Sequence, residues 1–481
     1  MVFSSFGFVF SFLPLVLLGY YLLSWLIKDM PLLRRCQNLL LIFASLVFYG
    51  WFDPSYLWII MASILVNYAL ALGMRSRRDS KPIKKALLIL GIVFNVAMIG
   101  WFKYYDFFAE NINFLFHTDI ALKHLLLPLG ISFFTFQQLS FLVSVYKEEE
   151  QVEDFINYCV FVLFFPQLVA GPIVLYSEMV PQFKDSPRCR FNSHNMASGI
   201  YIFCIGLFKK AVLADTLALF VNNGFAQESL GFLPALAVVL GYALQIYFDF
   251  SGYSDMAVGL GRMFNIDIPF NFLSPYKSES FTELWRRWHI TLGRALSSYI
   301  YKPLGGSRKG LSRTCINLML TFLISGLWHG AAWTFIIWGL GHGAFTVLER
   351  CLGEKLNKIP HPLRVLSCFL FCSLLWVVFR VESFQQAGMV YEGMLGLNGL
   401  GYSQIAALAM DNTINFPTIV DAVYIFGMVG VLLWVVFTRD NSRDMLLRFK
   451  PCGRTLGFTA LLFCLALIHL SRESIFIYFN F

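Results

Sequence analysis

A histidine lies within one of the most apolar stretches of the sequence. His329 stands in the middle of "LTFLISGLWHGAAWTFIIWGLGHG", which runs from Leu320 to Gly343, and no charged residue occurs between Arg313 and Glu349. An ionisable side chain is costly to place in an apolar membrane segment, so it is a candidate functional residue. Apolar surroundings favour the neutral imidazole, which can accept a proton from a bound hydroxyl. The pattern therefore makes His329 a candidate general base, and the alternative is a buried histidine without a chemical role.

A second histidine lies in a segment with helical periodicity. In "SFTELWRRWHITLGRALSSYIY", from Ser280 to Tyr301, one amphipathic helix would place His289 on an aromatic face and the charged residues opposite. We expect this helix to lie at the membrane interface or to enter a pocket, with His289 as the second catalytic candidate. The alternative is a buried core histidine without a chemical role. For His342, among glycines, we favour such a structural role.

Two carboxylates close the apolar span near residues 230–250. The stretch "YFDFSGYSD" contains Asp249 and Asp255, which could face a functional pocket, orient an arginine or cap the next helix. The residues predicted to line a pocket near the histidines are Trp285, Trp288, Trp328, Asp249 and Asp255.

A basic, glycine-bearing loop could bind the phosphates of a donor. "KPLGGSRKG" contains Lys302, Arg308 and Lys309, and backbone amides together with cations can hold phosphate groups. An ordinary cytoplasmic basic loop has the same composition, so both interpretations stay open. The sequence contains neither a Gly-x-Ser-x-Gly elbow nor a Cys/His ligand cluster, which argues against a serine hydrolase and against a zinc site.

The elements that position these residues are predicted to be membrane helices. The chain has 481 residues, of which 58% are hydrophobic and 14% charged, whereas soluble domains carry roughly 25% charged residues. We therefore predict an all-α polytopic membrane protein with one multi-span domain over residues 1–481, and membrane lipid but no nucleic acid as a partner. About eleven crossings are expected from the apolar segments near residues 4–27, 37–52, 56–74, 86–102, 126–146, 155–170, 196–221, 230–250, 312–335, 336–349, 364–380, 418–438 and 455–470.

The basic segment "RSRRDSKPIKK" predicts the orientation of the chain. It runs from Arg75 to Lys85 and holds six Lys or Arg residues against one Asp, so we place it in the cytoplasm. Three predicted spans precede it, which puts the N-terminus outside.

Several motifs resemble the membrane-bound O-acyltransferase family, most of all its bacterial branch that contains the alginate O-acetyltransferases. They are, in chain order, "LPLGISFFTFQQLS", "FFPQLVAGPI", "GLFKKAVLAD", "YALQIYFDFSGYSDMAVGLGRMF", "ELWRRWHITL", "YKPLGGSRKG", "SGLWHGAAWTFIIWGLGHG" and the terminal "FIYFNF". The resemblance implies a funnel of about eleven transmembrane helices with re-entrant and amphipathic helices. It also matches His329 to the family's near-invariant histidine and His289 to the second active-site position.

The resemblance further implies acyl transfer to a hydroxyl in the bacterial inner membrane. The donor would be cytoplasmic acetyl-CoA, a substrate rather than a bound cofactor. The acceptor would be an extracytoplasmic polysaccharide, as in alginate biosynthesis, with a periplasmic acetyltransferase as partner. His329 would act as the general base or form a transient acyl-enzyme, and His289 would position the acceptor or stabilise the oxyanion.

The sequence departs from the branch pattern at five positions. Ser144 stands where we expect an Asp, and Leu175 where we expect an Arg. Ala295 stands where we expect a Trp, and Ser297 and Ser298 where we expect an Arg-Asp pair. These departures concern acceptor or partner contacts. Three alternatives follow: a D-alanyl transferase that uses an acyl carrier protein and teichoic acid, a transporter with a histidine proton relay, and a structural membrane scaffold.

Overall fold

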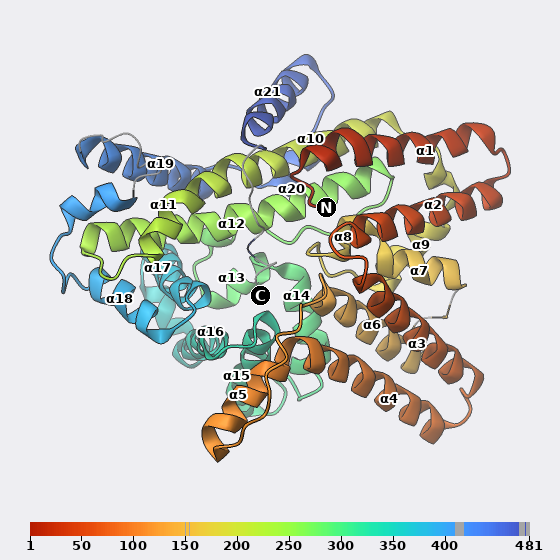
Figure 1. The fold of residues 1–481 in the computed structure, drawn as a ribbon, viewed down its shortest axis with the longest axis horizontal. Helices are drawn as coiled ribbons and strands as arrows, with labels where there is room; N and C mark the ends of the chain where they lie inside the picture. Colours follow the sequence, from red (N-terminus) through yellow and green to blue (C-terminus); the bar gives the residue numbers. More distant parts are fainter. Residues whose placement is uncertain (150, 153, 409–417, 471–476, 478–481) are drawn as a thin grey trace. The chain divides into compact units, whose positions relative to one another are not determined.

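The computed structural model describes residues 1–481 except 150, 153, 409–417, 471–476 and 478–481. The described part contains helices and no strands, which confirms the predicted all-α class (Figure 1). Most of the terminal "FIYFNF" motif lies outside the described residues.

The α-helices are α1 Leu13–Leu26, α2 Met30–Gly50, α3 Tyr56–Ser76, α4 Lys81–Ile99, α5 Tyr105–Phe116, α6 Ile131–Tyr146, α7 Phe155–Leu163, α8 Phe165–Leu168, α9 Tyr176–Lys184, α10 Ser193–Phe208, α11 Asp215–Phe225, α12 Phe232–Met263, α13 Phe281–Arg287, α14 Ile290–Leu296, α15 Gly310–His329, α16 Trp333–Leu352, α17 His361–Arg380, α18 Phe384–Met394, α19 Thr418–Thr438, α20 Ser442–Leu447 and α21 Gly453–His469. Four π-helical segments adjoin them: η1 Phe8–Phe12, η2 Gly100–Tyr104, η4 Lys209–Ala214 and η6 Ser297–Tyr301. Four short 3₁₀ turns complete the set: η3 Ser186–Cys189, η5 Pro275–Lys277, η7 Gly353–Lys358 and η8 Tyr402–Leu408.

Eight helices in the described part of the chain are long and apolar enough to cross a membrane. They are Phe8–Leu26, Met30–Gly50, Tyr56–Ser76, Lys81–Phe116, Phe232–Met263, Gly310–His329, His361–Arg380 and Thr418–Thr438. Two shorter apolar helices, Ile131–Tyr146 and Gly453–His469, accompany them. The protein is therefore a multi-pass membrane protein. The predicted span near residues 155–170 is instead divided into α7 and α8, because Phe164 leaves the helical conformation. Pro166 lies in the first turn of α8, where its missing N–H needs no helical partner.

Side-chain caps explain where several helices begin. Asp29, Asp154, Ser280, Ser383 and Asn441 each accept a hydrogen bond from the backbone N–H three residues ahead, at the start of α2, α7, α13, α18 and α20. Such a cap satisfies one of the four N–H groups that a helix start leaves without a partner. Local polar residues therefore set the helix boundaries within a largely apolar chain.

The chain groups into two compact units. The first unit contains residues 1–205, 253–269 and 449–461, and the second contains residues 206–252, 270–448 and 462–481. Both candidate histidines belong to the second unit. The single domain predicted over residues 1–481 stays a prediction.

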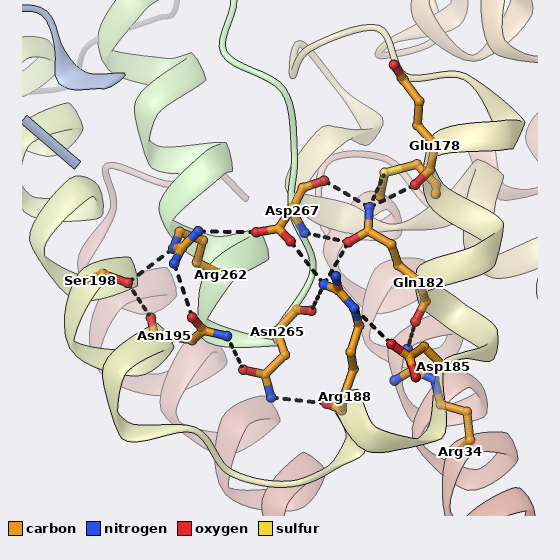
Figure 2. A network of polar contacts seen from close by, with 11 residues as sticks. Arg34, Glu178, Gln182, Asp185, Arg188, Asn195, Ser198, Arg262, Asn265 and Asp267 are labelled. Atoms are coloured by element: carbon orange, nitrogen blue, oxygen red, sulfur yellow. Dashed lines mark hydrogen bonds and ion pairs between the residues drawn. The ribbon is translucent and has the colours of Figure 1, made fainter. Parts of the chain in front are cut away.

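A polar network orders part of the first unit (Figure 2). The Arg188 guanidinium donates to the Gln182 side chain at 3.0 Å, to the Asn265 carbonyl at 2.7 Å and to Asp267 at 3.0 Å. Arg262 pairs with the other oxygen of Asp267 at 3.2 Å. The chain that follows α12 is thereby fixed to the segments around α9 and the start of α10.

Candidate active site

Glycines bring α15 and α16 of the second unit into close contact. A Cβ added at Gly326 would lie 2.3 Å from the Phe335 carbonyl oxygen, and one at Gly339 would lie 2.4 Å from the Phe322 carbonyl oxygen. Only residues without a Cβ let two helix backbones approach so closely. The glycines of the motif "SGLWHGAAWTFIIWGLGHG" thus form a tight hairpin, and His329 is the last residue of its first helix.

Aromatic rings surround the His329 imidazole. The ring centroid of Trp338 lies 4.9 Å away at an interplanar angle of 89°, that of Trp328 lies 4.9 Å away, and that of Phe379 lies 5.3 Å away. Edge-to-face packing of this kind fixes the orientation of a ring. His329 is buried, with 4% of its surface exposed.

His289 lies at a break between two helices, and the single helix predicted from Ser280 to Tyr301 is wrong in this respect. α13 ends at Arg287 and α14 begins at Ile290, and His289 adopts the left-handed conformation with φ 44° and ψ 52°. For an L-residue other than glycine this conformation costs roughly 1–2 kcal/mol. The periodicity of apolar residues continues across the break, so the sequence pattern contains no sign of it.

Contacts with a neighbouring loop hold both sides of the break. The Ile290 amide donates to the Asn271 carbonyl at 3.1 Å, and the Leu273 amide donates to the Arg287 carbonyl at 2.9 Å. At the other end of α13, the amides of Phe281 and Thr282 donate to Glu349 of α16. The bonds of Ile290 and Arg287 replace helical bonds that the break removes, and Glu349 accepts from two amides at the start of α13.

The His289 side chain is completely buried in apolar surroundings. Its ring lies 4.8 Å from the Phe250 ring and 6.0 Å from the Trp328 ring. Neither imidazole nitrogen has a hydrogen-bond partner among the described residues. His289 lies outside the eight candidate spans, and burial lowers its pKa to about 3. The imidazole is therefore neutral at physiological pH, with one ring nitrogen able to donate and the other able to accept a hydrogen bond.

The two candidate histidines meet at one indole. Trp328 lies 4.9 Å from the His329 ring and 6.0 Å from the His289 ring, measured between ring centroids. Forty residues separate the histidines in sequence, and the structure nevertheless places both in one aromatic cluster. The rings of this cluster that contact the two histidines are those of Phe250, Trp328, Trp338 and Phe379. Both imidazoles are buried and contact the same indole.

A third histidine belongs to the same cluster, although the sequence favoured a structural role for it. The Trp285 indole donates to Nδ1 of His342 at 3.3 Å, and the His342 ring lies 4.9 Å from that of Trp338. His342 follows Trp338 by four residues on α16, so helical spacing places both on one face. This spacing could have connected His342 to the cluster, because Trp338 also contacts His329.

A pocket of about 390 Å³ lies beside this cluster. It is lined by Thr282, Trp285, Arg286, Ile290, Leu292, Gly293, Arg294, Leu296, Ser297, Tyr301, Leu318, Thr321, Phe322 and Ser325. Ser325 precedes His329 by one turn of α15, so the pocket reaches the helix that carries His329. Arg286 and Arg294 add positive charge to a wall of apolar and hydroxyl side chains, which suits a ligand with an apolar arm and an anionic end.

Of the residues predicted to line a pocket, Trp285 lines this one. Trp328 contacts both histidines, whereas Trp288 packs against Trp376, with ring centroids 4.8 Å apart. Asp249 forms an ion pair with Lys210 at 2.7 Å and accepts a hydrogen bond from the Ile477 amide. Asp255 is buried and belongs to the first unit.

Internal hydrogen bonds fix the shape of the basic loop. The amides of Gly305, Gly306 and Arg308 donate to carbonyls within the loop, and the Asn317 side chain donates to the carbonyls of Leu304 and Gly306. Those three amides are therefore already used. The side chains of Lys302, Arg308 and Lys309 are exposed, and they follow Tyr301, which lines the pocket. Any phosphate held here would be held mainly by these cations.

Within the described residues, no group of three or more His, Cys, Asp or Glu side chains is arranged to hold a metal ion. The chemistry available at this site is that of imidazoles, indoles, hydroxyls and cations.

Comparisons with known proteins identify the family to which the sequence is similar. The model of the membrane-bound O-acyltransferase family matches residues 91–360, which include both histidines, the pocket and the basic loop. The chain is 40% identical to a peptidoglycan O-acetyltransferase of Helicobacter pylori, over 100% of this chain and 98% of that protein. It is 38% identical to a "Probable alginate O-acetylase" of Pseudomonas aeruginosa, over 84% of this chain and 77% of that protein. A teichoic acid D-alanyltransferase of Bacillus subtilis is 30% identical over 42% of this chain.

Proposed function

Because this chain belongs to the membrane-bound O-acyltransferase family, we propose that it transfers acetyl groups to hydroxyls of an extracytoplasmic polysaccharide. The observation that carries the proposal is the meeting of His289 and His329 at Trp328. The names of two relatives, one for peptidoglycan and one for alginate, support acetyl as the group and a polysaccharide as the acceptor.

In the proposed reaction His329 is the general base. The acceptor hydroxyl attacks the carbonyl carbon of the acetyl thioester while the His329 imidazole takes the hydroxyl proton. The C–O bond forms and the C–S bond breaks. The sulfur then takes the proton from the imidazolium, so that the products are an acetyl ester and a free thiol. His289 positions the acceptor or, through a ring N–H, stabilises the negative charge on the carbonyl oxygen.

Acetyl-CoA is the proposed donor, and it would enter through the pocket beside Trp285. Its phosphates would meet Lys302, Arg308 and Lys309, while its apolar arm would extend along the wall towards Ser325. Ser297, which stands where the family pattern leads us to expect an arginine, also lines this pocket. The pocket walls therefore combine apolar surface for the arm with cations for the charged end.

The proposed setting is the bacterial inner membrane with the N-terminus outside. The basic segment from Arg75 to Lys85 supports this orientation, since basic loops remain in the cytoplasm. Acetyl-CoA is cytoplasmic and the acceptor is not, so the acetyl group must cross the membrane within the protein. We expect a periplasmic acetyltransferase partner to complete the modification.

The test uses purified protein in detergent with radiolabelled acetyl-CoA. Loss of the thioester and labelling of the protein are followed in the wild type, His329→Ala and His289→Ala, with gel filtration to check folding. His194→Ala is the matched control, because His194 is exposed and belongs to the first unit. Turnover that collapses in folded His329→Ala and persists in His194→Ala supports the proposal.

The result that contradicts the proposal is turnover in His329→Ala equal to that of the wild type. Absence of turnover in every variant, including the wild type, points to another donor or a missing partner. The same assay is then run with a D-alanyl carrier protein, since a teichoic acid D-alanyltransferase is among the more distant relatives.

A further inference from the structure

We propose that Asn271 is a positioning residue that holds His289 in its left-handed conformation. The inference rests on the proposed acyl transfer, because it assigns to Asn271 the orientation of an imidazole that acts in that reaction. Asn271 lies in the loop between α12 and α13, eighteen positions before His289 in the printed sequence.

Asn271 makes three contacts with the two residues that follow His289. Its side-chain Oδ1 accepts from the Thr291 amide at 3.1 Å and from the Thr291 hydroxyl at 2.7 Å. Its backbone carbonyl accepts from the Ile290 amide at 3.1 Å. The first two amides of α14 are therefore bound to one residue, and the chain must turn at His289 to deliver them there.

This arrangement works as a helix cap supplied from a distant part of the chain. The first four N–H groups of a helix have no partner within that helix, and a local Asn, Asp, Ser or Thr usually accepts one of them. His289 occupies the cap position of α14 and makes no side-chain cap bond. Asn271 accepts these bonds instead, which leaves the His289 imidazole directed to Phe250 and Trp328.

Burial makes the Asn271 contacts difficult to replace. The Asn271 side chain is completely buried, so water cannot take over the role of Oδ1 when the side chain is truncated. The amide nitrogen Nδ2 has no hydrogen-bond partner among the described residues. Of the two polar atoms of the Asn271 side chain, only Oδ1 is thus used in holding α14. A substitution that keeps an acceptor oxygen in the side chain should therefore keep the effect.

Three variants separate the roles of the two side-chain atoms. Asn271→Leu has nearly the same volume and lacks the acceptor. Asn271→Asp retains an acceptor oxygen in either protonation state and replaces Nδ2. Thr291→Val removes the hydroxyl bond and leaves the amide bond in place. Asn95→Leu is the matched control, because Asn95 is also completely buried and hydrogen-bonded, to Asn67 at 2.6 Å, in the first unit.

The first measurement is hydrogen–deuterium exchange of the full-length protein in detergent, followed in peptides that cover residues 288–293. We expect faster exchange in this segment for Asn271→Leu, a smaller increase for Thr291→Val, and wild-type exchange for Asn271→Asp and Asn95→Leu. Unchanged exchange in Asn271→Leu overturns the proposal. This measurement needs no acyl donor, so it tests the role of Asn271 even where acetyl-CoA proves to be the wrong substrate.

The second measurement is turnover of acetyl-CoA. For Asn271→Leu we expect kcat to fall about 10²-fold with KM changed by less than about 3-fold, since a misplaced catalytic group costs rate on this scale. Asn271→Asp should stay within about 5-fold of the wild-type kcat. Asn95→Leu should lower the melting temperature without this selective loss of kcat. Faster exchange in Asn271→Leu with an unchanged kcat overturns the positioning role, and so does a loss of kcat in Asn271→Asp equal to that in Asn271→Leu.

Discussion

The aromatic cluster of the second unit and the polar network of the first unit treat polar side chains in opposite ways. In the network, the partly exposed Arg188 and Arg262 both pair with the exposed Asp267, and the buried Asn265 bonds to Asn195 and to two backbone carbonyls (Figure 2). In the cluster, His289 has two buried ring nitrogens without a hydrogen-bond partner among the described residues. Native proteins satisfy almost all buried polar groups, so an exception requires an explanation.

The difference indicates which region serves stability and which serves chemistry. A network of paired donors and acceptors fixes chain segments relative to one another. An imidazole enclosed by aromatic rings, by contrast, keeps its ring nitrogens available for hydrogen bonds to a substrate. Substitutions in the two regions should therefore affect different quantities: turnover in the cluster, and the free energy of unfolding in the network.

The largest effect is expected for His329→Ala. Removal of a general base lowers the rate by about 10²–10⁴-fold. The melting temperature in detergent should change little by comparison, because the helix hairpin that carries His329 is held by its glycines. The measurement is kcat for acetyl transfer together with thermal unfolding. Loss of stability in parallel with activity would show that His329 acts as a core residue, and the contrast between the two regions would disappear.

A smaller effect is expected for Gly326→Ala. The added Cβ would lie 2.3 Å from the Phe335 carbonyl oxygen, so α15 and α16 must move apart. Overpacking of this kind costs typically about 1–3 kcal/mol, and His329 would also move relative to Trp338. Both the melting temperature and kcat should fall.

Gly427→Ala on α19 is the control for this change. A Cβ at Gly427 meets no atom within 4 Å, and alanine favours a helix more than glycine does. Its melting temperature should stay equal or rise. An equal loss in both variants would mean that close helix contact is not the reason for Gly326.

Within the polar network, Asn265→Gly should lower stability and leave chemistry intact. Asn265 is buried and left-handed, with φ 61°, and its side chain donates to the carbonyls of Arg188 and Arg190. Glycine accepts the same backbone conformation, so the change removes only the side-chain bonds, at a cost of about 1–2 kcal/mol. The folded enzyme should keep its kcat. A selective loss of kcat would assign this network to the reaction.

Composition and motif order were sufficient to predict the fold class, because an apolar chain with few charges must satisfy its backbone within helices. The sequence also directed attention to His289 and His329, since ionisable residues in apolar segments are rare. It could not predict the break at His289. The residue that stabilises the break, Asn271, lies on a separate loop, and local periodicity contains no information about contacts between distant segments.

The glycines of α15 and α16 also show that a sequence motif does not reveal tertiary contacts. Gly326 and Gly339 were visible in the sequence as parts of a motif, but their purpose depends on the distance between two backbones. The basic loop shows the converse, because its composition left phosphate binding by backbone amides open, whereas the amides of Gly305 and Gly306 are used within the loop. Residue types thus located the site, and only the tertiary contacts specified how each atom is used.

At pH 6, the smallest effect is expected from the titration of the buried His289 imidazole. Burial lowers the pKa of His289 to about 3, whereas the unfolded chain has a histidine pKa of about 6.5. As the pH falls below about 6.5, the unfolded state therefore binds a proton that the folded state does not, and stability is lost. At pH 6 the loss from this residue is about 1 kcal/mol, and it grows towards pH 4.

His289→Asn isolates this contribution. Asparagine tolerates the left-handed conformation better than most residues and does not titrate, so the variant should lack this part of the acid-dependent destabilisation. The measurement is the difference in unfolding free energy between the wild type and the variant at pH 7.5, 6 and 5. This difference should shift in favour of the variant as the pH falls. A difference that stays constant over this range would mean that the His289 imidazole takes up a proton as readily in the folded protein as in the unfolded chain. That result would contradict its enclosure in an apolar site and would remove the contrast between an unsatisfied cluster and a satisfied network.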